Sequence, residues 1–147
     1  MKRLLIISFL FLPFFYACNN NTTDRSDTTV TSESDVDAAR NFIRSALDGH
    51  YDKARKLIIS DSANNGWIDL FERNYQSRMN LEDKRGYRES SINIHNVKQL
   101  NDSISIINYS NSYKKKDDSL KVIKIKDAWL IDLKYSFPSS QNVDSLP

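Results

Sequence analysis

The sequence predicts an α+β domain in which three N-terminal helices pack on a curved four-stranded antiparallel sheet. Apolar residues recur at helical spacing from about Asp35 to Lys84, and from Ser90 to Phe137 they recur with a period of two. Short turn segments separate the alternating runs, and short connections make neighbouring strands antiparallel. Residues 35–137 are therefore expected to form one domain.

The first helix is predicted to begin at Ser34 or Asp35 and to end at Gly49. Serine and aspartate are favoured caps, and Asp37 in the first turn complements the helix dipole. Gly49 can adopt the left-handed conformation that ends many helices. The apolar stripe of this helix consists of Val36, Ala39, Phe42, Ile43, Ala46 and Leu47.

Two further helices are predicted after the first. Ala54, Leu57 and Ile58 extend a helical pattern over residues 51–59. After a polar break at residues 61–65, a third helix is expected from Gly66 to Lys84, with Gly86 at its exit. Its apolar side would consist of Trp67, Leu70, Phe71, Tyr75 and Leu81.

Four strands are predicted at residues 92–100, 103–113, 119–126 and 129–137, with turns between them. On the last strand, one face carries Trp129, Ile131, Leu133 and Tyr135. Because this apolar face should pack inward, the opposite parity is expected to turn Asp132 outward to solvent. A general acid or base at Asp132 is therefore not expected.

Residues 1–17 have the features of a signal peptide. A short positive start precedes an apolar run that ends at Ala17, and this run is shorter than the roughly 20 residues that span a bilayer. The only cysteine, Cys18, follows directly, and the junction resembles a bacterial lipobox, with Phe15 where leucine is usual. In lipoproteins the cysteine is acylated, for example with palmitate, and stable anchoring needs two or more acyl chains. We expect Cys18 to be the site of lipidation.

The mature chain is expected to be nearly neutral. Lys2 and Arg3 are removed with the signal, so the 21 basic residues fall to 19 and equal the 19 acidic residues. A nucleic-acid-binding protein would need a basic face, so this balance argues against nucleic acid as a partner. Residues 18–34 and 138–147 are polar and are predicted to be a disordered tether and a disordered tail.

The segment ARNFIRSALDGHYDKARKLI resembles the opening of the nuclear-transport-factor-2-like, or cystatin-like, fold in its small bacterial lipoprotein form, the type called domain of unknown function 4878. The positions that match are Phe42, Ala46, Leu47, Gly49, Tyr51, Ala54 and Leu57. The segment IKIKDAWLIDL is similar to the family's closing hairpin through Trp129, Ile131 and Leu133, although Asp127 and Ala128 replace the turn glycine. The resemblance implies a cone between sheet and helices, and proteins of this fold include enzymes, ligand carriers and proteins without known chemistry.

Aromatic and amide side chains are the candidates for lining a pocket in this cone. In a small domain such residues also commonly fill the core, so both interpretations stay open. Tyrosine hydroxyls and asparagine amides at a pocket mouth would orient a small apolar or neutral ligand. The candidate residues are Trp67, Tyr75, Tyr109, Asn111, Tyr113 and Trp129.

No catalytic constellation is visible in the sequence, so an enzyme is not expected. His95 is opposite in parity to Ile92 and Ile94, which places it on the outer sheet face unless a bulge before Val97 reverses it. His50 lies in a turn between helices, where a capping role is expected. No cluster of ligating residues, phosphate loop or nucleophile motif is present, so no metal or cofactor is predicted.

These observations predict a lipid-anchored bacterial envelope protein whose domain binds a small ligand or a protein without catalysis. One alternative is a small hydratase- or isomerase-like enzyme that uses His95 with a tyrosine. Another is a structural or assembly lipoprotein that recruits an envelope protein through its sheet. Because Asn19 follows Cys18 and no acidic cluster comes next, we expect the anchor to lie in the outer membrane, with the domain facing the periplasm.

Overall fold

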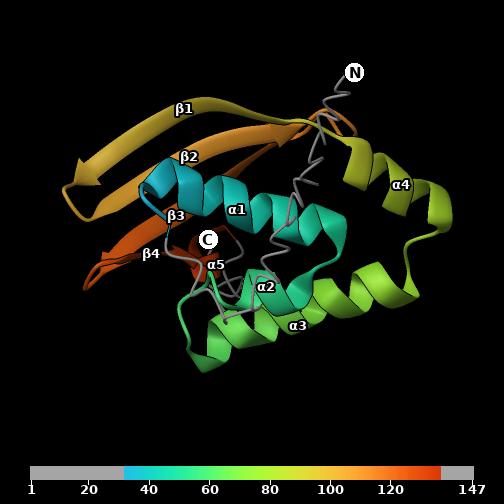
Figure 1. Ribbon diagram of the computed structural model, residues 1–147, viewed down its shortest axis with the longest axis horizontal. Coiled ribbons are helices and arrows are strands. Elements are labelled where there is room, and N and C mark those ends of the chain that lie inside the picture. The colour runs from blue at the N-terminus through green and yellow to red at the C-terminus, as the bar shows by residue number, and fades with distance from the viewer. Residues whose placement is uncertain (1–31, 137–147) are drawn as a thin grey trace, which may run out of the picture.

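The computed structural model of the chain describes residues 32–136 and confirms the α+β class. An open antiparallel sheet has the strand order β1–β2–β3–β4, and α1 lies across one face of it (Figure 1). The signal peptide, Cys18 and residues 138–147 lie outside the described residues. The elements are α1 (Asp35–Asp48), α2 (Tyr51–Arg55), α3 (Ser62–Ser77), α4 (Leu81–Glu89), β1 (Ile92–Asn101), β2 (Ile104–Asn111), β3 (Asp117–Ile125), β4 (Ala128–Asp132) and α5 (Leu133–Ser136).

Helix α1 begins and ends as the sequence predicts, and it supplies the centre of the core. The Ser34 hydroxyl accepts a hydrogen bond from the Asp37 N–H, and Gly49 ends the helix with a φ of 79°. Ala38, Ala39, Phe42 and Ile43 are buried against the sheet. Ser32 is also buried and accepts a hydrogen bond from the Asn41 amide, so the folded part of the chain includes the last residues of the predicted tether.

The predicted third helix is wrong, because this region forms two helices. Asp61 caps α3 by accepting from the Asn64 N–H at 2.8 Å, so the helix begins inside the expected polar break. Asn80 then caps α4 in the same way through the Asp83 N–H at 2.8 Å. Gly86 lies within α4 instead of at a helix exit. Leu81, expected on the apolar side, is 85% exposed because it starts the new helix.

The sheet is a meander with one bulge that matters for His95. The register shifts between Ile94 and Asn96, which leaves His95 as the extra residue. The bulge pairs Val97 with Ile107, a buried core residue on the helix-facing side. It therefore turns Val97 toward the helices, whereas His95 stays on the opposite face.

The last strand is shorter than predicted, because the chain leaves the sheet after Asp132. The buried Asn64 accepts a hydrogen bond from the Leu133 N–H at 2.7 Å, and α5 starts at that residue. Ile131 and Leu133 are buried as expected, but Tyr135 is exposed because it follows the strand.

Asp132 was predicted to reach solvent, but only 9% of the residue is exposed. It pairs across the strands with Lys121. The neighbouring pair, Val122 and Ile131, faces the helices, so Asp132 and Lys121 lie on the other face of the sheet. The predicted parity is therefore correct. Lys121 and Lys134 approach its carboxylate to 4.0 and 3.8 Å and help to cover it.

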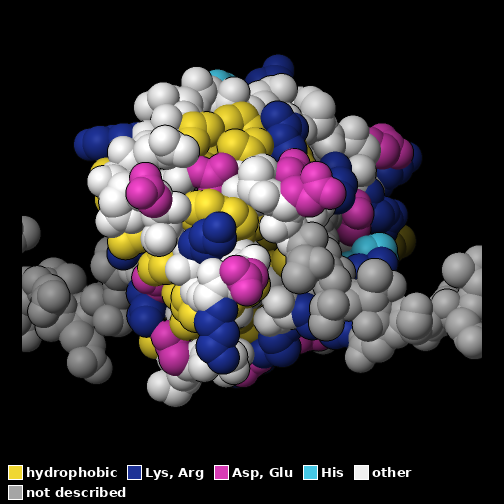
Figure 2. All heavy atoms as spheres, turned by 60° about the vertical axis from the view of Figure 1, so that its left-hand side comes forward, with side chains coloured by type: hydrophobic (Ala, Val, Ile, Leu, Met, Phe, Trp, Pro, Cys, Tyr) yellow, Lys and Arg dark blue, Asp and Glu magenta, His cyan; other side chains and the backbone are white. Residues whose placement is uncertain are grey.

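Charges of both signs are distributed over the surface. The face drawn in Figure 2 interleaves Lys and Arg with Asp and Glu around small apolar patches. Within residues 32–136, no helix is long and apolar enough to cross a membrane.

Glycine-to-alanine substitutions at two helix positions should change the free energy of unfolding by different amounts. A Cβ on Gly66 would meet no atom within 4 Å, so Gly66→Ala should stabilise the domain by roughly 0.5–1 kcal/mol through helix propensity. A Cβ on Gly86 would lie 2.3 Å from the Tyr113 ring, so Gly86→Ala must displace that ring. We expect urea unfolding to place Gly86→Ala at least about 1 kcal/mol below Gly66→Ala. Equal stabilisation of both variants would contradict the close packing of Tyr113 on α4.

Candidate ligand-binding cavity

A cavity of about 230 Å³ is lined mainly by residues of α1, α3 and strand β2, with Tyr87 of α4 among them. Its walls are mainly aromatic and aliphatic, with two asparagine side chains among them. Such a combination of apolar walls and a few polar groups is typical of small-molecule sites. The lining residues are Phe42, Ile43, Ala46, Leu47, Tyr51, Phe71, Asn74, Tyr75, Met79, Tyr87, Tyr109, Asn111 and Leu120.

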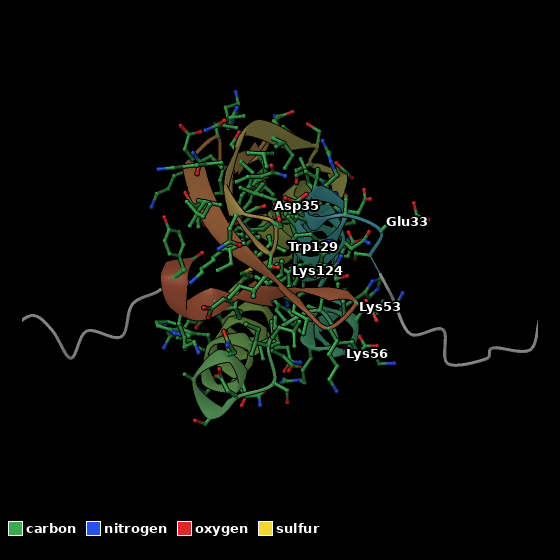
Figure 3. All side chains as sticks on the ribbon, turned by 90° about the vertical axis from the view of Figure 1, so that its left-hand side faces the viewer. Glu33, Asp35, Lys53, Lys56, Lys124 and Trp129 are labelled. Carbon is green, nitrogen blue, oxygen red and sulfur yellow. The ribbon has the colours of Figure 1, made fainter. Side chains whose placement is uncertain are left out.

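Three of the six predicted pocket residues line this cavity: Tyr75, Tyr109 and Asn111. Trp67 does not, and its ring packs beside Phe71 at a centroid distance of 6.1 Å. Trp129 lies on the β3–β4 hairpin beside Lys124, near the start of α1 (Figure 3). For Trp67 and Trp129 the interpretation as packing residues is therefore favoured.

Tyr113, the third absent residue, packs on the outside of the cavity wall. Its ring contacts Tyr87 edge-on at 5.2 Å, and its hydroxyl donates to the Asp83 carboxylate at 2.8 Å. The lack of a side chain on Gly86 provides the space for this ring. Tyr113 thus supports the position of α4 instead of facing a ligand.

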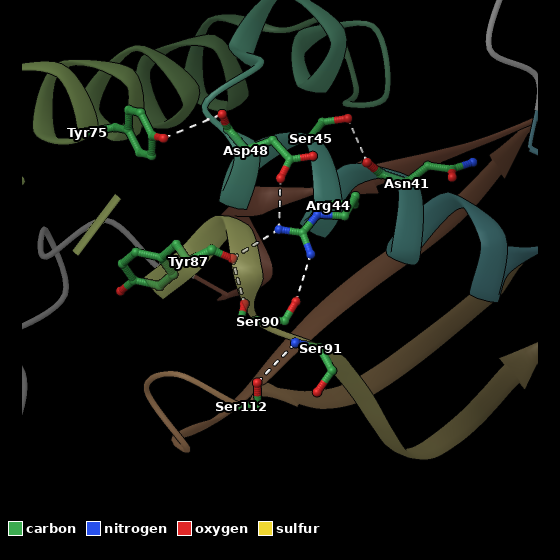
Figure 4. Close-up of polar contacts among 9 residues, drawn as sticks. All are labelled: Asn41, Arg44, Ser45, Asp48, Tyr75, Tyr87, Ser90, Ser91 and Ser112. Carbon is green, nitrogen blue, oxygen red and sulfur yellow. Dashed lines mark hydrogen bonds and ion pairs between the residues drawn. The ribbon is translucent and has the colours of Figure 1, made fainter. Parts of the chain in front are cut away.

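Arg44 fixes the helix end that carries Tyr87 (Figure 4). Its guanidinium donates to the carbonyl oxygens of Ser90 at 2.8 Å and of Tyr87 at 3.0 Å, and it pairs with Asp48 at 2.9 Å. One side chain of α1 therefore holds α4 over the cavity.

Tyr75 reaches the cavity from α3 across the end of α1. Its hydroxyl donates to the Asp48 carbonyl oxygen at 3.4 Å, and its ring meets Tyr51 edge-on at 5.7 Å. A Cβ on Gly49 would lie 2.4 Å from the Tyr75 ring. Gly49 is therefore required both for its left-handed backbone and for this close approach.

The ionisable groups of the cavity wall are tyrosine hydroxyls. Burial raises the pKa of Tyr109, and the nearby Asp118 carboxylate raises it further. Burial also raises the pKa of Tyr51 and of Tyr87. Among the described residues, the cavity wall contains no carboxylate and no histidine. It can offer hydroxyl and amide groups to a ligand but no ordinary proton shuttle.

His95 lies on the other face of the sheet, where its ring is 46% exposed. Its Nε2 atom lies 2.8 Å from the Ser110 hydroxyl and 3.4 Å from an Asp117 carboxylate oxygen. A serine–histidine–aspartate triad needs the serine and the acid on different ring nitrogens, and here both contacts use the same one. His95 therefore cannot act on a ligand in the cavity, and the contacts do not form a catalytic triad.

His50 caps the start of α2 through its backbone and is exposed. The Ala54 N–H donates to its carbonyl oxygen at 3.0 Å. Within residues 32–136, no group of three or more histidine, cysteine or acidic side chains is placed to hold a metal ion.

Sequence patterns alone missed Tyr87, Asn74 and Met79 as cavity residues. Tyr87 was assigned to no element, because the expected helix ended before it. The Asn80–Asp83 pair is a recognisable capping pattern and would have indicated a helix that carries Tyr87. Nothing local to Asn74 or Met79 indicates that they share a cavity with residues of β2, since that depends on how α3 packs.

Comparisons with protein-family models, with curated proteins and with solved structures find no match to the chain. The resemblance to nuclear-transport-factor-2-like lipoproteins thus stays a prediction from the residues quoted above.

Replacing Arg44 with lysine should loosen α4. An ammonium can keep the pairing with Asp48 but cannot reproduce a fork that reaches two carbonyl oxygens. We expect Arg44→Lys to lower the free energy of unfolding by about 1–2 kcal/mol, because the two hydrogen bonds from the charged guanidinium to carbonyl oxygens are lost and the removal of the unpaired buried Nε offsets only part of that loss. Urea unfolding measures this change. Arg40→Lys, one turn earlier on α1 and exposed, is the matched control and should change stability by less than about 0.5 kcal/mol. Equal effects of the two variants would contradict the proposed tie.

Proposed function

We propose that this protein is a bacterial envelope lipoprotein, anchored through Cys18, whose α+β domain binds a small apolar ligand without catalysis. The observation that carries the binding role is the aromatic cavity of about 230 Å³. The anchor rests on the signal-like residues 1–17 and on the position of the only cysteine directly after them. Asn19 favours the outer membrane, with the domain in the periplasm.

The cavity supports binding because its walls combine apolar area with few polar atoms. Phe42, Phe71 and Leu120 offer surface that a ligand can bury, which is the main source of affinity in such sites. Asn74 and Asn111 offer amide groups that can orient the ligand. The neutral tyrosines support a binding role over acid–base chemistry.

The alternative enzyme that uses His95 with a tyrosine finds no support in the geometry. The imidazole lies across the sheet from Tyr109, which faces the cavity. A general base must lie within hydrogen-bond reach of the proton that it removes.

Removal of the Cys18 thiol tests the anchor. Cys18→Ser should abolish labelling by radioactive palmitate and release the protein from the membrane fraction, because a hydroxyl does not replace the acylated thiol. Mass spectrometry of the wild-type chain should find an acylated mature protein that begins at Cys18. Asn19→Ser is the matched control and should stay acylated. A mature wild-type chain without acyl groups would refute the anchor.

Filling the cavity tests the binding role. Ala46 lines the cavity from α1, so Ala46→Phe places a ring in the ligand space, whereas the exposed Ala63 on α3 offers a control site for Ala63→Phe. In a thermal-shift screen of small apolar compounds, ligands that raise the Tm of the wild type should not raise that of Ala46→Phe. Circular dichroism checks that the variant is folded, and Ala46→Val provides a smaller change if it is not. Undiminished shifts in a folded Ala46→Phe variant would place the ligand elsewhere.

A further inference from the structure

The cavity adjoins a second hollow of about 270 Å³, here called the vestibule. Its lining residues are Tyr87, Tyr109, Asn111, Lys114, Lys116 and Asp118. The first three also line the cavity, so both hollows share one wall of side chains. The two lysines come from the loop between β2 and β3.

The two lysines give the vestibule cationic groups that are not neutralised by ion pairs. The Lys114 Nζ lies 5.8 Å from the ring centroids of both Tyr87 and Tyr113. Such cation–π contacts hold the ammonium at the mouth without cancelling its charge. Within the described part of the chain, neither Lys114 nor Lys116 forms a salt bridge with a carboxylate.

The acid of the vestibule is already engaged by the protein. Asp118 lies across the strands from Tyr109, and its carboxylate accepts a hydrogen bond from the Ser119 N–H at 2.7 Å. It offsets one of the two lysine charges, so the vestibule retains an excess of positive charge. Lys84 adds a further cation near the rim, 5.3 Å from the Tyr75 ring centroid.

Asn111 adds a hydrogen-bond donor at this end of the cavity. The Asn111 side-chain oxygen accepts from the Lys114 N–H at 2.8 Å, which leaves the NH₂ group of that amide for a ligand. The Tyr75 hydroxyl already donates to the Asp48 carbonyl oxygen, so the donors left for a ligand are the Asn111 amide and the two lysines. A ligand group that completes this arrangement must supply acceptor oxygens, and a negative charge would complement the lysines.

We propose that the cavity and vestibule together bind a small apolar carboxylate, with its hydrocarbon part in the cavity and its carboxylate between Lys114 and Lys116. The inference rests on the proposed ligand-binding function and replaces a neutral ligand with an anionic one. At about 30 Å³ per water-sized group, the cavity volume holds about eight such groups. The ligand is therefore an aromatic or medium-chain aliphatic acid, and a long-chain fatty acid does not fit.

Matched acids and amides test the charge requirement. The lipid-anchored mature chain, reconstituted in zwitterionic nanodiscs, is titrated calorimetrically with 3-phenylpropionate, octanoate and their neutral amides, and empty nanodiscs serve as the blank. The acids should bind about three- to tenfold more tightly than their amides. Raising the salt from about 0.05 M to about 0.5 M should weaken binding of the acids only.

Lysine variants locate the effect. Lys114→Met and Lys116→Met should each reduce the preference for acid over amide by about threefold, and the double variant should remove it. Lys115→Met removes the same charge from the same loop, but Lys115 does not line the vestibule, so the preference should persist. Binding of the amides to Lys115→Met should stay unchanged, and circular dichroism checks that all of these variants are folded.

The outcomes separate this inference from the function on which it rests. If amides bind the wild type as tightly as acids, or if the double variant keeps the preference, the carboxylate assignment is overturned while the ligand cavity stands. If neither acids nor amides bind, both proposals are overturned for this ligand class. Tighter binding of palmitate than of octanoate would overturn the size limit and indicate a lipid as the source of the carboxylate.

Discussion

The geometry of this domain depends on the guanidinium of Arg44. It joins the end of α1 to the carbonyl oxygens of Tyr87 and Ser90, residues more than forty positions further along the chain. Tyr87 and Ser90 lie at the end of α4, just before β1. One side chain therefore fixes the point at which the chain passes from the helices to the sheet. Without these hydrogen bonds, α4 would lose its polar link to α1 and would keep its packing on α1 and its contacts with Tyr113. Its position over the cavity would then be less firmly fixed.

The position of α4 also separates apolar from charged space. Inside the cavity the ionisable groups are phenols, and burial disfavours the charged form of Tyr51 and Tyr109. At the mouth, Lys114 lies over the rings of Tyr87 and Tyr113, at the boundary between the buried wall and water. An amphipathic ligand would match this arrangement, with its apolar part in the cavity and its polar group at the mouth. The same arrangement explains why a site built from these residues suits binding better than proton transfer.

The elements that follow from local chemistry were predictable. Ser34 and Gly49 bound α1 as expected, and the alternation of apolar residues located all four strands. The misplaced third helix had a local cause as well, because Asp61 and Asn80 are capping residues that were interpreted as parts of a break and of a helix. In contrast, the end of β4 has no local signal, since Leu133 leaves the sheet through a bond to Asn64, 69 residues earlier.

The sequence by itself determined the fold class, the strand order of a meander with short turns and the near balance of basic and acidic residues. These features depend on side-chain period, backbone preference and composition, which are all local or additive. Only the tertiary structure decided that Tyr75, Tyr87, Tyr109 and Asn111 share one cavity, that Trp129 does not, and that Lys114 and Lys116 adjoin it. The physical reason is that a cavity is the space left after distant helices and strands pack, and long-range contacts such as that of Arg44 determine where this space lies.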